Sequence, residues 1–364
     1  MIGIRTVTGA SQRQRGVALI LVLLVVALGT AIVTAMRTTA EISFARTANV
    51  LMQQQSVEFA LAGETYARLL LKKDLEEDKK TGELVDFDVD NKADPLNEVW
   101  GVRAVQIPIS LTSGIEGQID DLQGRFNMNS LLKVTGGRDA SGALRTTVNT
   151  LALEKLNRLL DSLYDDEGSI QRPPELHREH FVDWLDDNQD SLNFKGAEDY
   201  EYLGKVPPYR TGGTWFRDMT ELWLIEAMTP EVYRALEPHV AFLPWWVTQV
   251  NVNTATVPVL MATLSIPRQN AEEIVAERLK LGGFKDLTKD FLSLPALAGK
   301  GSTSQDLTLA SSYFQASIRS INEDSIMRLL STLYRDPNDG STLVLQRDYG
   351  KKFELTKQIA ILDQ

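Results

Sequence analysis

An uninterrupted apolar segment near the N-terminus constrains this chain more than any other feature. Residues 17–36 are all apolar or small and carry no charge. A helix of this length can cross a bilayer, at ~1.5 Å of rise per residue. Arg5, Arg13 and Arg15 precede the segment and Arg37 follows it. Because Lys and Arg are retained on the cytoplasmic side, we expect the N-terminus to stay inside and the rest of the chain to be exported.

The junction between the basic leader and the apolar segment carries a second signal. Gly16 stands before the apolar run, whereas a secretory signal peptide places its small-residue cleavage site after it. Arg15-Gly16 followed by Val-Ala-Leu-Ile-Leu resembles the leader of type IV pilins and of the pseudopilins of bacterial type II secretion. The resemblance implies cleavage by a prepilin peptidase between Gly16 and Val17, and methylation of the new terminal amine. The alternatives are an uncleaved signal anchor and a Sec signal cut near Thr34-Ala35.

One position departs from the common pilin pattern. Most pilins and pseudopilins carry a glutamate five residues into the mature chain, and here that position is Leu21. Among pseudopilins, the large minor subunit called protein K is the member that lacks this glutamate. Such a glutamate is thought to pair with the terminal amine of the preceding subunit, since an isolated carboxylate in lipid is costly. A subunit with Leu21 therefore suits the tip of a filament, where no subunit precedes it.

The bulk properties exclude several kinds of function. The chain has 364 residues, enough for two or three domains. It has no cysteine, which excludes disulfides, thiolate metal sites and cysteine nucleophiles. Its formal net charge of −11 repels phosphate backbones and argues against nucleic acid as a partner.

Sequence periodicity predicts the order of the elements. One continuous helix is expected over 17–73, although a break near Arg37 would give an anchor followed by a separate helix. The charged stretch 72–94 reads as a loop. Helices are expected from 151 to 281, where residues 222–236 and 259–274 look loosely alike. Strands are expected at 99–111, 115–121, 313–321, 325–334 and 341–349, the fourth against a local helical preference because a turn at 336–340 pairs it with the fifth.

This order predicts an α+β fold: a long N-terminal transmembrane helix and a pilin-like antiparallel sheet, with a large inserted all-α domain containing helix-hairpin-helix-like units. The phrase Asp121-Leu-Gln-Gly-Arg-Phe-Asn-Met-Asn and the interrupted sheet resemble protein K over nearly the whole chain. The expected boundaries are a leader at 1–16, the long helix at 17–75, the first part of the sheet domain at 76–145, the α-helical insert at 146–311 and C-terminal strands at 312–364.

The densest polar constellation is the acidic loop, which we define as residues 183–201. Asp186, Asn188 and Asp190 fit the first half of a calcium loop, whose alternate oxygens suit a hard cation. Glu198 and Asp199 could complete the ligand set, although the second half departs from the EF-hand pattern. From the residues alone, a solvated acidic surface is an equal alternative. The resemblance to the protein K segment associated with calcium favours a calcium site.

Other motifs are weaker. The segment 251–281 resembles a helix-hairpin-helix, but its turn lacks the glycine pair whose amides face phosphate, so scaffolding is favoured over DNA binding. His177 and His180 are spaced for one helix face, but no third zinc ligand is apparent. No nucleophile elbow, P-loop or dinucleotide fingerprint is present, so no cofactor-binding or catalytic residue is assigned and an anchored hydrolase is a distant third hypothesis.

The resemblance therefore implies a non-enzymatic minor pseudopilin of type II secretion. It would be a single-pass inner-membrane protein with its bulk in the periplasm, located at the tip of the pseudopilus, where it would help to initiate assembly. The implied partners are the minor pseudopilins of types H, I and J, the prepilin peptidase, the inner-membrane assembly platform and the membrane itself. The alternative is a membrane-anchored helix-hairpin-helix protein that handles DNA in a competence-like system.

Overall fold

The computed structural model describes residues 14–81, 103–138, 144–163, 173–299, 304–323 and 325–361. The chain divides into two compact units, Met1–Glu58 and Phe59–Gln364. The first unit holds the membrane-length apolar segment. The second holds a sheet and a domain of mostly helical segments.

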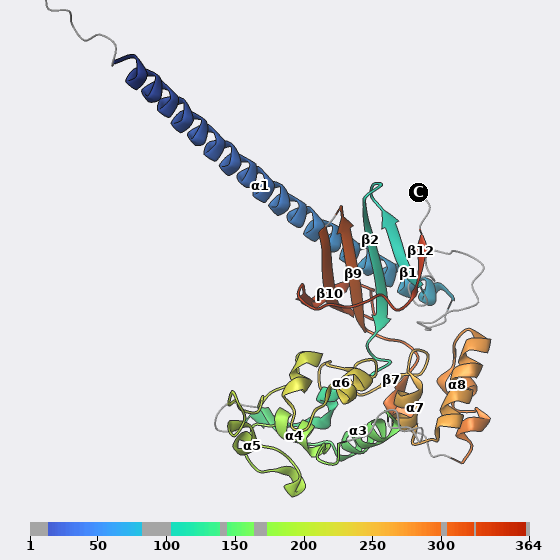
Figure 1. The fold of residues 1–364 in the computed structure, drawn as a ribbon. Helices are drawn as coiled ribbons and strands as arrows, with labels where there is room; N and C mark the ends of the chain where they lie inside the picture. The colour runs from blue at the N-terminus through green and yellow to red at the C-terminus, as the bar shows by residue number, and fades with distance from the viewer. Residues whose placement is uncertain are drawn as a thin grey trace, which may run out of the picture. The chain divides into compact units, whose positions relative to one another are not determined.

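A single helix, α1 (Gln14–Thr81), opens the described part of the chain (Figure 1). Its 68 residues correspond to ~100 Å at 1.5 Å per residue. The helix continues through Arg37, so the alternative of a break there is not realised. The helix also continues past Lys73 to Thr81, so the prediction of a loop over 72–94 is wrong for residues 72–81. Leu75 is buried there and Asp74 forms an ion pair with the sheet, which explains the extension.

Within the first unit, the expected membrane segment lies wholly in α1. Among the described residues, α1 is the one helix that is long and apolar enough to cross a membrane. Its apolar side chains from Val17 to Met36 are exposed. The Thr30 hydroxyl donates to the Ala27 carbonyl at 2.9 Å and the Thr34 hydroxyl to the Thr30 carbonyl at 2.8 Å. These hydroxyls are thus satisfied within the helix, as an apolar environment requires.

The second unit contains a six-stranded sheet in the order β11-β10-β9-β2-β1-β12. Neighbouring strands are antiparallel, except that β1 and β12 are parallel. The segment expected to be a strand despite its helical preference is confirmed as β10, because it pairs with β9 along its length. The strands are β1 (Arg103–Pro108), β2 (Ser113–Asp121), β9 (Tyr313–Asn322), β10 (Ser325–Arg335), β11 (Thr342–Asp348) and β12 (Gln358–Ile361).

The C-terminal part of α1, from Phe59, covers one face of this sheet. Ala60, Ala67 and Leu71 of the helix pack with Ile318 and Leu333 of the strands in one buried cluster.

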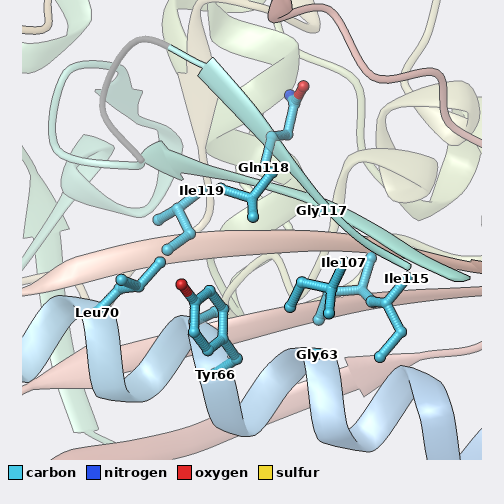
Figure 2. A pocket seen from close by; sticks show the side chains of 11 residues that line it. Gly63, Tyr66, Leu70, Ile107, Ile115, Gly117, Gln118 and Ile119 are labelled. Carbon is cyan, nitrogen blue, oxygen red and sulfur yellow. The ribbon is translucent and has the colours of Figure 1, made fainter. Parts of the chain in front are cut away.

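The close approach of α1 to the sheet depends on Gly63. A Cβ atom at this position would come within 2.8 Å of Ile318 and 2.9 Å of Ile115, so a larger residue would force the helix away. Figure 2 shows the small apolar cavity of about 30 Å³ that Tyr66 and Leu70 line beside it. The single glycine between Arg37 and Lys73 therefore has a packing role.

Two charged pairs fix α1 to the sheet. Glu64 is buried and accepts hydrogen bonds from Arg347 at 2.7 Å and from the Ser331 hydroxyl at 2.6 Å. Arg335 is buried and donates to Asp74 at 2.7 Å and to the Leu71 carbonyl at 3.1 Å. Because Arg347 lies on β11 and Arg335 on β10, the two pairs join α1 to these neighbouring strands.

The helical domain is inserted between two adjacent central strands. β2 and β9 pair from Ser113 opposite Asn322 to Asp121 opposite Phe314. The insert therefore spans 122–312 and begins earlier than the expected boundary at 146. The reason is that β3 (Phe126–Asn127) pairs with β6 (Val240–Ala241) instead of joining the six-stranded sheet. The α+β fold with an inserted domain is confirmed.

Further elements of the insert are mostly short helices, and we call this insert the α-domain (Figure 1). They are η1 (Met128–Leu131), β4 (Leu132–Arg138), β5 (Leu144–Val148), α3 (Thr150–Leu163), α4 (Glu179–Leu185), η2 (Leu192–Phe194), α5 (Asp199–Leu203), η3 (Met219–Leu224), α6 (Pro230–Leu236), β7 (Val250–Asn251), α7 (Val257–Leu264), α8 (Arg268–Leu281), η4 (Leu287–Phe291), η5 (Pro295–Leu297), η6 (Ser304–Asp306) and β8 (Leu307–Thr308). The side chains of Leu156, Leu160, Phe181 and Leu260 lie in its core, which is separate from the core under the sheet.

The same pair of side-chain hydrogen bonds occurs in both halves of the α-domain. Asn129 donates to the Phe216 carbonyl at 2.9 Å and accepts from the Phe216 amide at 2.8 Å. Asn253 makes the same pair of bonds to Phe284, at 3.0 and 2.8 Å. Each asparagine follows a two-residue strand that pairs in parallel. The regions after Asn127 and Asn251 therefore share a local similarity that the comparison of the two helical segments did not include.

Candidate functional site: the acidic loop and the N-terminal anchor

The acidic loop begins at the end of α4 and continues through η2 to α5. Asp183 and Asp186, at the C-terminal end of α4, are buried, as is Glu198 just before α5. All residues of α4 are buried, so Asp183 lies inside the α-domain together with the rest of the helix. A buried acidic group normally needs a positive partner or several hydrogen bonds.

Asp183 holds the loop in place. Both of its carboxylate oxygens accept the Leu192 amide, each at 3.2 Å. The loop backbone passes so close that a Cβ on Gly196 would lie 1.6 Å from one Asp183 oxygen. Only glycine fits at this position, and its absence of a side chain lets the chain bring Glu198 toward α4.

The buried carboxylates of the loop lack cationic neighbours. Oδ1 of Asp186 and both carboxylate oxygens of Glu198 are buried without a hydrogen-bond partner, and no described Lys or Arg forms an ion pair with Asp183, Asp186 or Glu198. Burial and the nearby charges of Asp183 and Asp186 together raise the pKa of Glu198 to about 8. Burial likewise raises the pKa of Asp183 to about 7 and that of Asp186 to about 6. These orphaned oxygens suit a bound cation.

The other three residues of the expected calcium set lie differently. Asn188 and Asp190 are exposed, and the Asn188 side chain accepts the Asp190 amide at 2.7 Å. Asp199 forms an ion pair with Arg210 at 2.9 Å and accepts the Thr211 amide at 3.0 Å. The structure therefore brings Asp186 and Glu198 together with Asp183, which sequence analysis did not assign as a ligand.

Among the described residues, no three His, Cys, Asp or Glu side chains are grouped as a ready metal site. Calcium is also commonly bound by main-chain and amide oxygens. The carboxylate oxygens of Asp186 and Glu198 are buried without hydrogen-bond partners, and such oxygens are neutralised either by a proton or by a cation.

The two histidines spaced for one helix face do not form a zinc site in the described residues. The rings of His177 and His180 are 5.4 Å apart and nearly perpendicular. His180 is buried, and its Nδ1 lies 3.1 Å from the Glu226 carbonyl. Burial lowers the pKa of His180, so it is a neutral core residue.

The helical hairpin formed by α7 and α8 uses its basic residues for packing. Arg278 is buried and donates to the carbonyls of Val252 and Ala255 at 3.0 and 2.9 Å. Arg268 donates to the Ser162 carbonyl at 2.9 Å. The turn between the helices passes through Ser265 in a left-handed conformation, without a glycine pair. The DNA-handling alternative therefore has no support in this hairpin.

The leader junction lies at the start of the described chain. Gly16 and Val17 fall in the first turns of α1, whereas Arg5 and Arg13 lie outside the described residues. From Val17 to Ala40 the helix contains no acidic residue, and the first is Glu41. The apolar anchor thus carries no carboxylate, in agreement with Leu21.

An apolar N-terminal helix that packs its C-terminal part on a mostly antiparallel sheet defines a pilin-like, membrane-anchored subunit. Two family models described as type II secretion system protein K match residues 124–245 and 250–310. The type II secretion system protein K of Pseudomonas aeruginosa is 34% identical over 340 residues, covering 93% of each chain. That of Klebsiella pneumoniae is 31% identical over 245 residues, covering 67% of each. This chain belongs to the type II secretion system protein K family and is a minor pseudopilin, a structural component of that system.

The fold has a solved counterpart. A chain in the crystal structure of the GspK–GspI–GspJ complex of the enterotoxigenic Escherichia coli type 2 secretion system matches with a TM-score of 0.64 and 22% identity. The match covers 84% of this chain and all of that one. The resemblance noted from the leader and the interrupted sheet is therefore confirmed, as are the fold class and the pseudopilin function.

Proposed function

We propose that this chain is the tip subunit of the pseudopilus and helps to initiate its assembly. The observation that carries this proposal is the insertion of the α-domain between β2 and β9. About half of the chain is added at one place on the sheet, which a closely packed filament shaft cannot accommodate. The absence of a carboxylate from Val17 to Ala40 supports the same position, since a subunit stacked above would find no partner for its terminal amine.

Crosslinking tests this position. Because the chain has no cysteine, a single Phe44→Cys substitution on the exposed part of α1 gives a unique reactive site. At the tip, this cysteine should crosslink to other minor pseudopilins in about one copy per filament. Deletion of the whole chain should reduce the number of filaments. A uniform distribution of crosslinks along the shaft would contradict the proposal.

The proposed partners are the minor pseudopilins of types H, I and J, the prepilin peptidase, the inner-membrane assembly platform and the membrane. Large side chains of α1 beyond the membrane segment are exposed, including Ile42, Phe44, Val50 and Leu51. Exposed apolar residues on a helix of this length favour packing against equivalent helices. The solved neighbour, by its title, is a complex with two other secretion subunits, which supports partners of the same class. The bulk of the chain would lie in the periplasm.

Processing at the leader is proposed between Gly16 and Val17, followed by methylation of the new amine. N-terminal sequencing and mass spectrometry of the membrane-bound protein test both steps. A terminus near Met36 would indicate a Sec signal and would remove the leader assignment.

The acidic loop is proposed as a calcium site. Asp186 and Glu198 would supply carboxylate oxygens, since theirs are buried and unpartnered. Asn188, Asp190 and Asp199 would complete the set after a local closing of the loop, and Asp183 would position the loop from α4. Bound calcium would neutralise the carboxylates and fix α5 relative to α4.

A further inference from the structure

The α-domain is joined to the sheet by two chain crossings that lie side by side. The chain leaves the sheet after Asp121 at the end of β2 and returns to it at Tyr313 at the start of β9. Between them, the Leu122 amide donates to the Tyr313 carbonyl at 3.0 Å. Domains connected in this way move relative to one another unless a large apolar interface holds them. The contacts around the two crossings therefore determine whether the α-domain is mobile on the sheet.

The apolar interface at the crossings is small. One buried cluster holds Leu122 and Tyr313 of the crossings together with Ala241 and Leu243 of the α-domain. This cluster is separate from the core under the sheet and from the core of the α-domain, and it is far smaller than the latter. Any rigid connection between the two parts therefore depends largely on polar contacts.

Asp121 accepts hydrogen bonds from both crossings and from the α-domain. Its Oδ1 accepts the Gln123 amide at 2.7 Å. Its Oδ2 accepts the Ser311 hydroxyl at 2.7 Å and the Asn251 side-chain amide at 3.0 Å, and it also accepts the Thr254 hydroxyl. Among the described residues, no Lys or Arg forms an ion pair with this carboxylate, so these four donors hold it.

The donors around Asp121 are fixed from other sides as well. Asn251 is fully buried at the end of β7, and its main-chain amide donates to the Gln123 carbonyl at 2.9 Å. Its side chain also donates to the Ser311 hydroxyl at 3.0 Å. The Gln123 side chain accepts the Ser312 amide at 2.6 Å. A satisfied network of buried polar groups favours one arrangement, because movement leaves some of these groups unpaired.

The network reaches α1 through one buried arginine. The Ser311 carbonyl accepts a hydrogen bond from Arg335 at 3.0 Å. The same guanidinium donates to Asp74 and to the Leu71 carbonyl, both on α1. Ser311 thus contacts Asp121 through its hydroxyl and Arg335 through its carbonyl, so two residues of the network connect the α-domain to the helix.

Gly124 allows the α-domain to approach Asp121. A Cβ atom on Gly124 would lie 2.5 Å from the Thr254 hydroxyl oxygen and 2.9 Å from the Thr254 carbonyl carbon. Because one of these atoms belongs to the main chain, a side chain at position 124 would displace the Thr254 segment and weaken its bond to Asp121. Gly124 therefore supports the contact without taking part in it.

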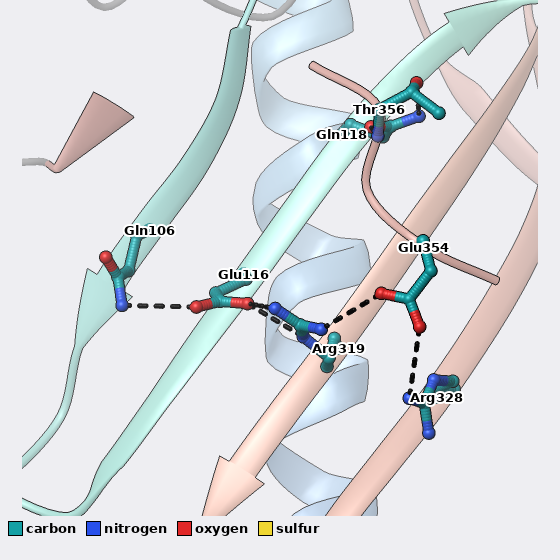
Figure 3. Close-up of polar contacts among 7 residues, drawn as sticks. All are labelled: Gln106, Glu116, Gln118, Arg319, Arg328, Glu354 and Thr356. Atoms are coloured by element: carbon teal, nitrogen blue, oxygen red, sulfur yellow. Dashed lines mark hydrogen bonds and ion pairs between the residues drawn. The ribbon is translucent and has the colours of Figure 1, made fainter. Parts of the chain in front are cut away.

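A second polar contact between the sheet and the α-domain lies at the surface. Lys351 follows β11 and pairs with Glu237 at 3.2 Å, and the Glu237 side chain is 45% exposed. Figure 3 shows the rest of this segment on the outer face of the sheet, with Glu354 beside Arg319 and Arg328. Exposed ion pairs contribute little to stability. This contact is therefore a poor candidate for fixing the α-domain.

We propose that Asp121 is a positioning residue that turns the two crossings into a rigid joint, which fixes the α-domain relative to the C-terminal part of α1. The joint consists of Asp121, Gln123, Asn251, Thr254 and Ser311. The proposal concerns the chain itself and does not depend on its place in the filament. Its consequence is that a displacement of the α-domain by a bound protein is passed on to α1, whereas flexible crossings would absorb it.

Distances between pairs of spin labels on the full chain in detergent micelles test the joint, since the chain has no native cysteine. One pair crosses the joint, from Thr65→Cys on α1 to Glu272→Cys on α8. The reference pair, Thr65→Cys with Leu111→Cys, stays on the sheet side, and all three side chains are exposed. We expect equally narrow distance distributions for the two pairs. A crossing distribution at least about twice as wide as the reference would show flexible crossings and overturn the proposal.

Variants of the joint test the role of Asp121. Asp121→Ala, and independently Gly124→Ala, should widen the crossing distribution at least about twofold and leave the reference distribution unchanged. Glu231→Ala is the control, because it removes an exposed carboxylate of α6 outside the joint, and it should change neither distribution. A crossing distribution that stays narrow in both variants would overturn the assignment of Asp121. Widening of both pairs would show a general loss of structure and would equally overturn it.

Discussion

The sheet and the acidic loop bury carboxylates in opposite ways. At the sheet, burial acts to raise the pKa of Glu64, but hydrogen bonds from Arg347 and Ser331 outweigh it, so the pKa is lowered. In the acidic loop, burial raises the pKa of Glu198 to about 8 and nothing offsets it. Both side chains are almost fully buried, at 2% and 4% exposure.

The difference separates a region that neutralises its own carboxylates from one that, in our proposal, uses a bound cation. The strands supply their own cations, Arg335 and Arg347, so the carboxylates of Asp74 and Glu64 on α1 are neutralised when the helix packs on the sheet. The acidic loop brings several carboxylates together, and among the described residues no Lys or Arg forms an ion pair with Glu198. Its stability should therefore respond to cations and to pH, whereas that of the sheet should respond to substitution of its own arginines.

The largest expected effect is at Arg335 in the sheet. Arg335→Ala should lower the free energy of unfolding of the second unit by ~3–5 kcal/mol, because it removes the buried guanidinium that pairs with Asp74 and bonds the carbonyls of Leu71 and Ser311. The Phe314 ring also loses the guanidinium that lies 4.7 Å from its centre. Chemical denaturation followed by near-UV circular dichroism measures the loss. A change as small as that of the exposed Arg217→Ala would contradict the sheet's dependence on its own cations.

Removal of calcium should have the next largest effect, confined to the α-domain. Bound calcium at one hundred times its dissociation constant stabilises by ~2.7 kcal/mol, so a chelator should lower the melting temperature of the α-domain and leave the sheet unchanged. Glu198→Gln should abolish this response, because it removes a buried carboxylate. Asp190→Ala should weaken it as well, although less, since Asp190 is exposed. Unchanged melting with chelator, together with no metal by elemental analysis, would show that the loop does not bind calcium.

The same contrast explains what sequence could predict. Periodicity located α1, β9 and β11, because their patterns are local, and the turn at 336–340 located β10 against its local helical preference. The start of the insert was missed, since the pairing of Phe126 with Val240 joins residues far apart in sequence. Asp183 was missed for the same reason: its role depends on Leu192 and on the space that Gly196 leaves. The repeated Asn-x-Asn at 127–129 and 251–253 was a visible signal of the internal similarity.

The pH dependence of the two regions should have opposite sign. For Asp183 and Glu198, the folded state holds protons that the unfolded state releases above about pH 4, so stability without calcium falls as pH rises toward about 8. For Glu64, with its lowered pKa, stability is present above the unfolded pKa and is lost as pH falls through the folded value. Melting of the chelated chain at pH 5.5 and pH 8 measures the first trend. Calcium should abolish the decline, because it binds the ionised carboxylates; a decline that persists with calcium would contradict the assignment.

The smallest expected effect concerns the one carboxylate of the calcium set that already has a cation. Asp199 is paired with Arg210, whose side chain is 72% exposed, so this pair contributes only ~0.2–1 kcal/mol. Arg210→Ala frees Asp199 to face calcium, and we expect affinity to increase by up to about fivefold, the factor that ~1 kcal/mol corresponds to. Isothermal titration calorimetry on the full chain measures it.

Arg234→Ala is the matched control for Arg210→Ala, because it removes the same charge from an exposed position of α6 without touching Asp199. If both variants tighten calcium binding equally, net charge is responsible and Asp199 is not a ligand. If only Arg210→Ala tightens binding, Arg210 and calcium compete for Asp199. Neutralisation by the chain's own arginine, as in the sheet, and neutralisation by calcium would then be alternatives at one side chain, Asp199.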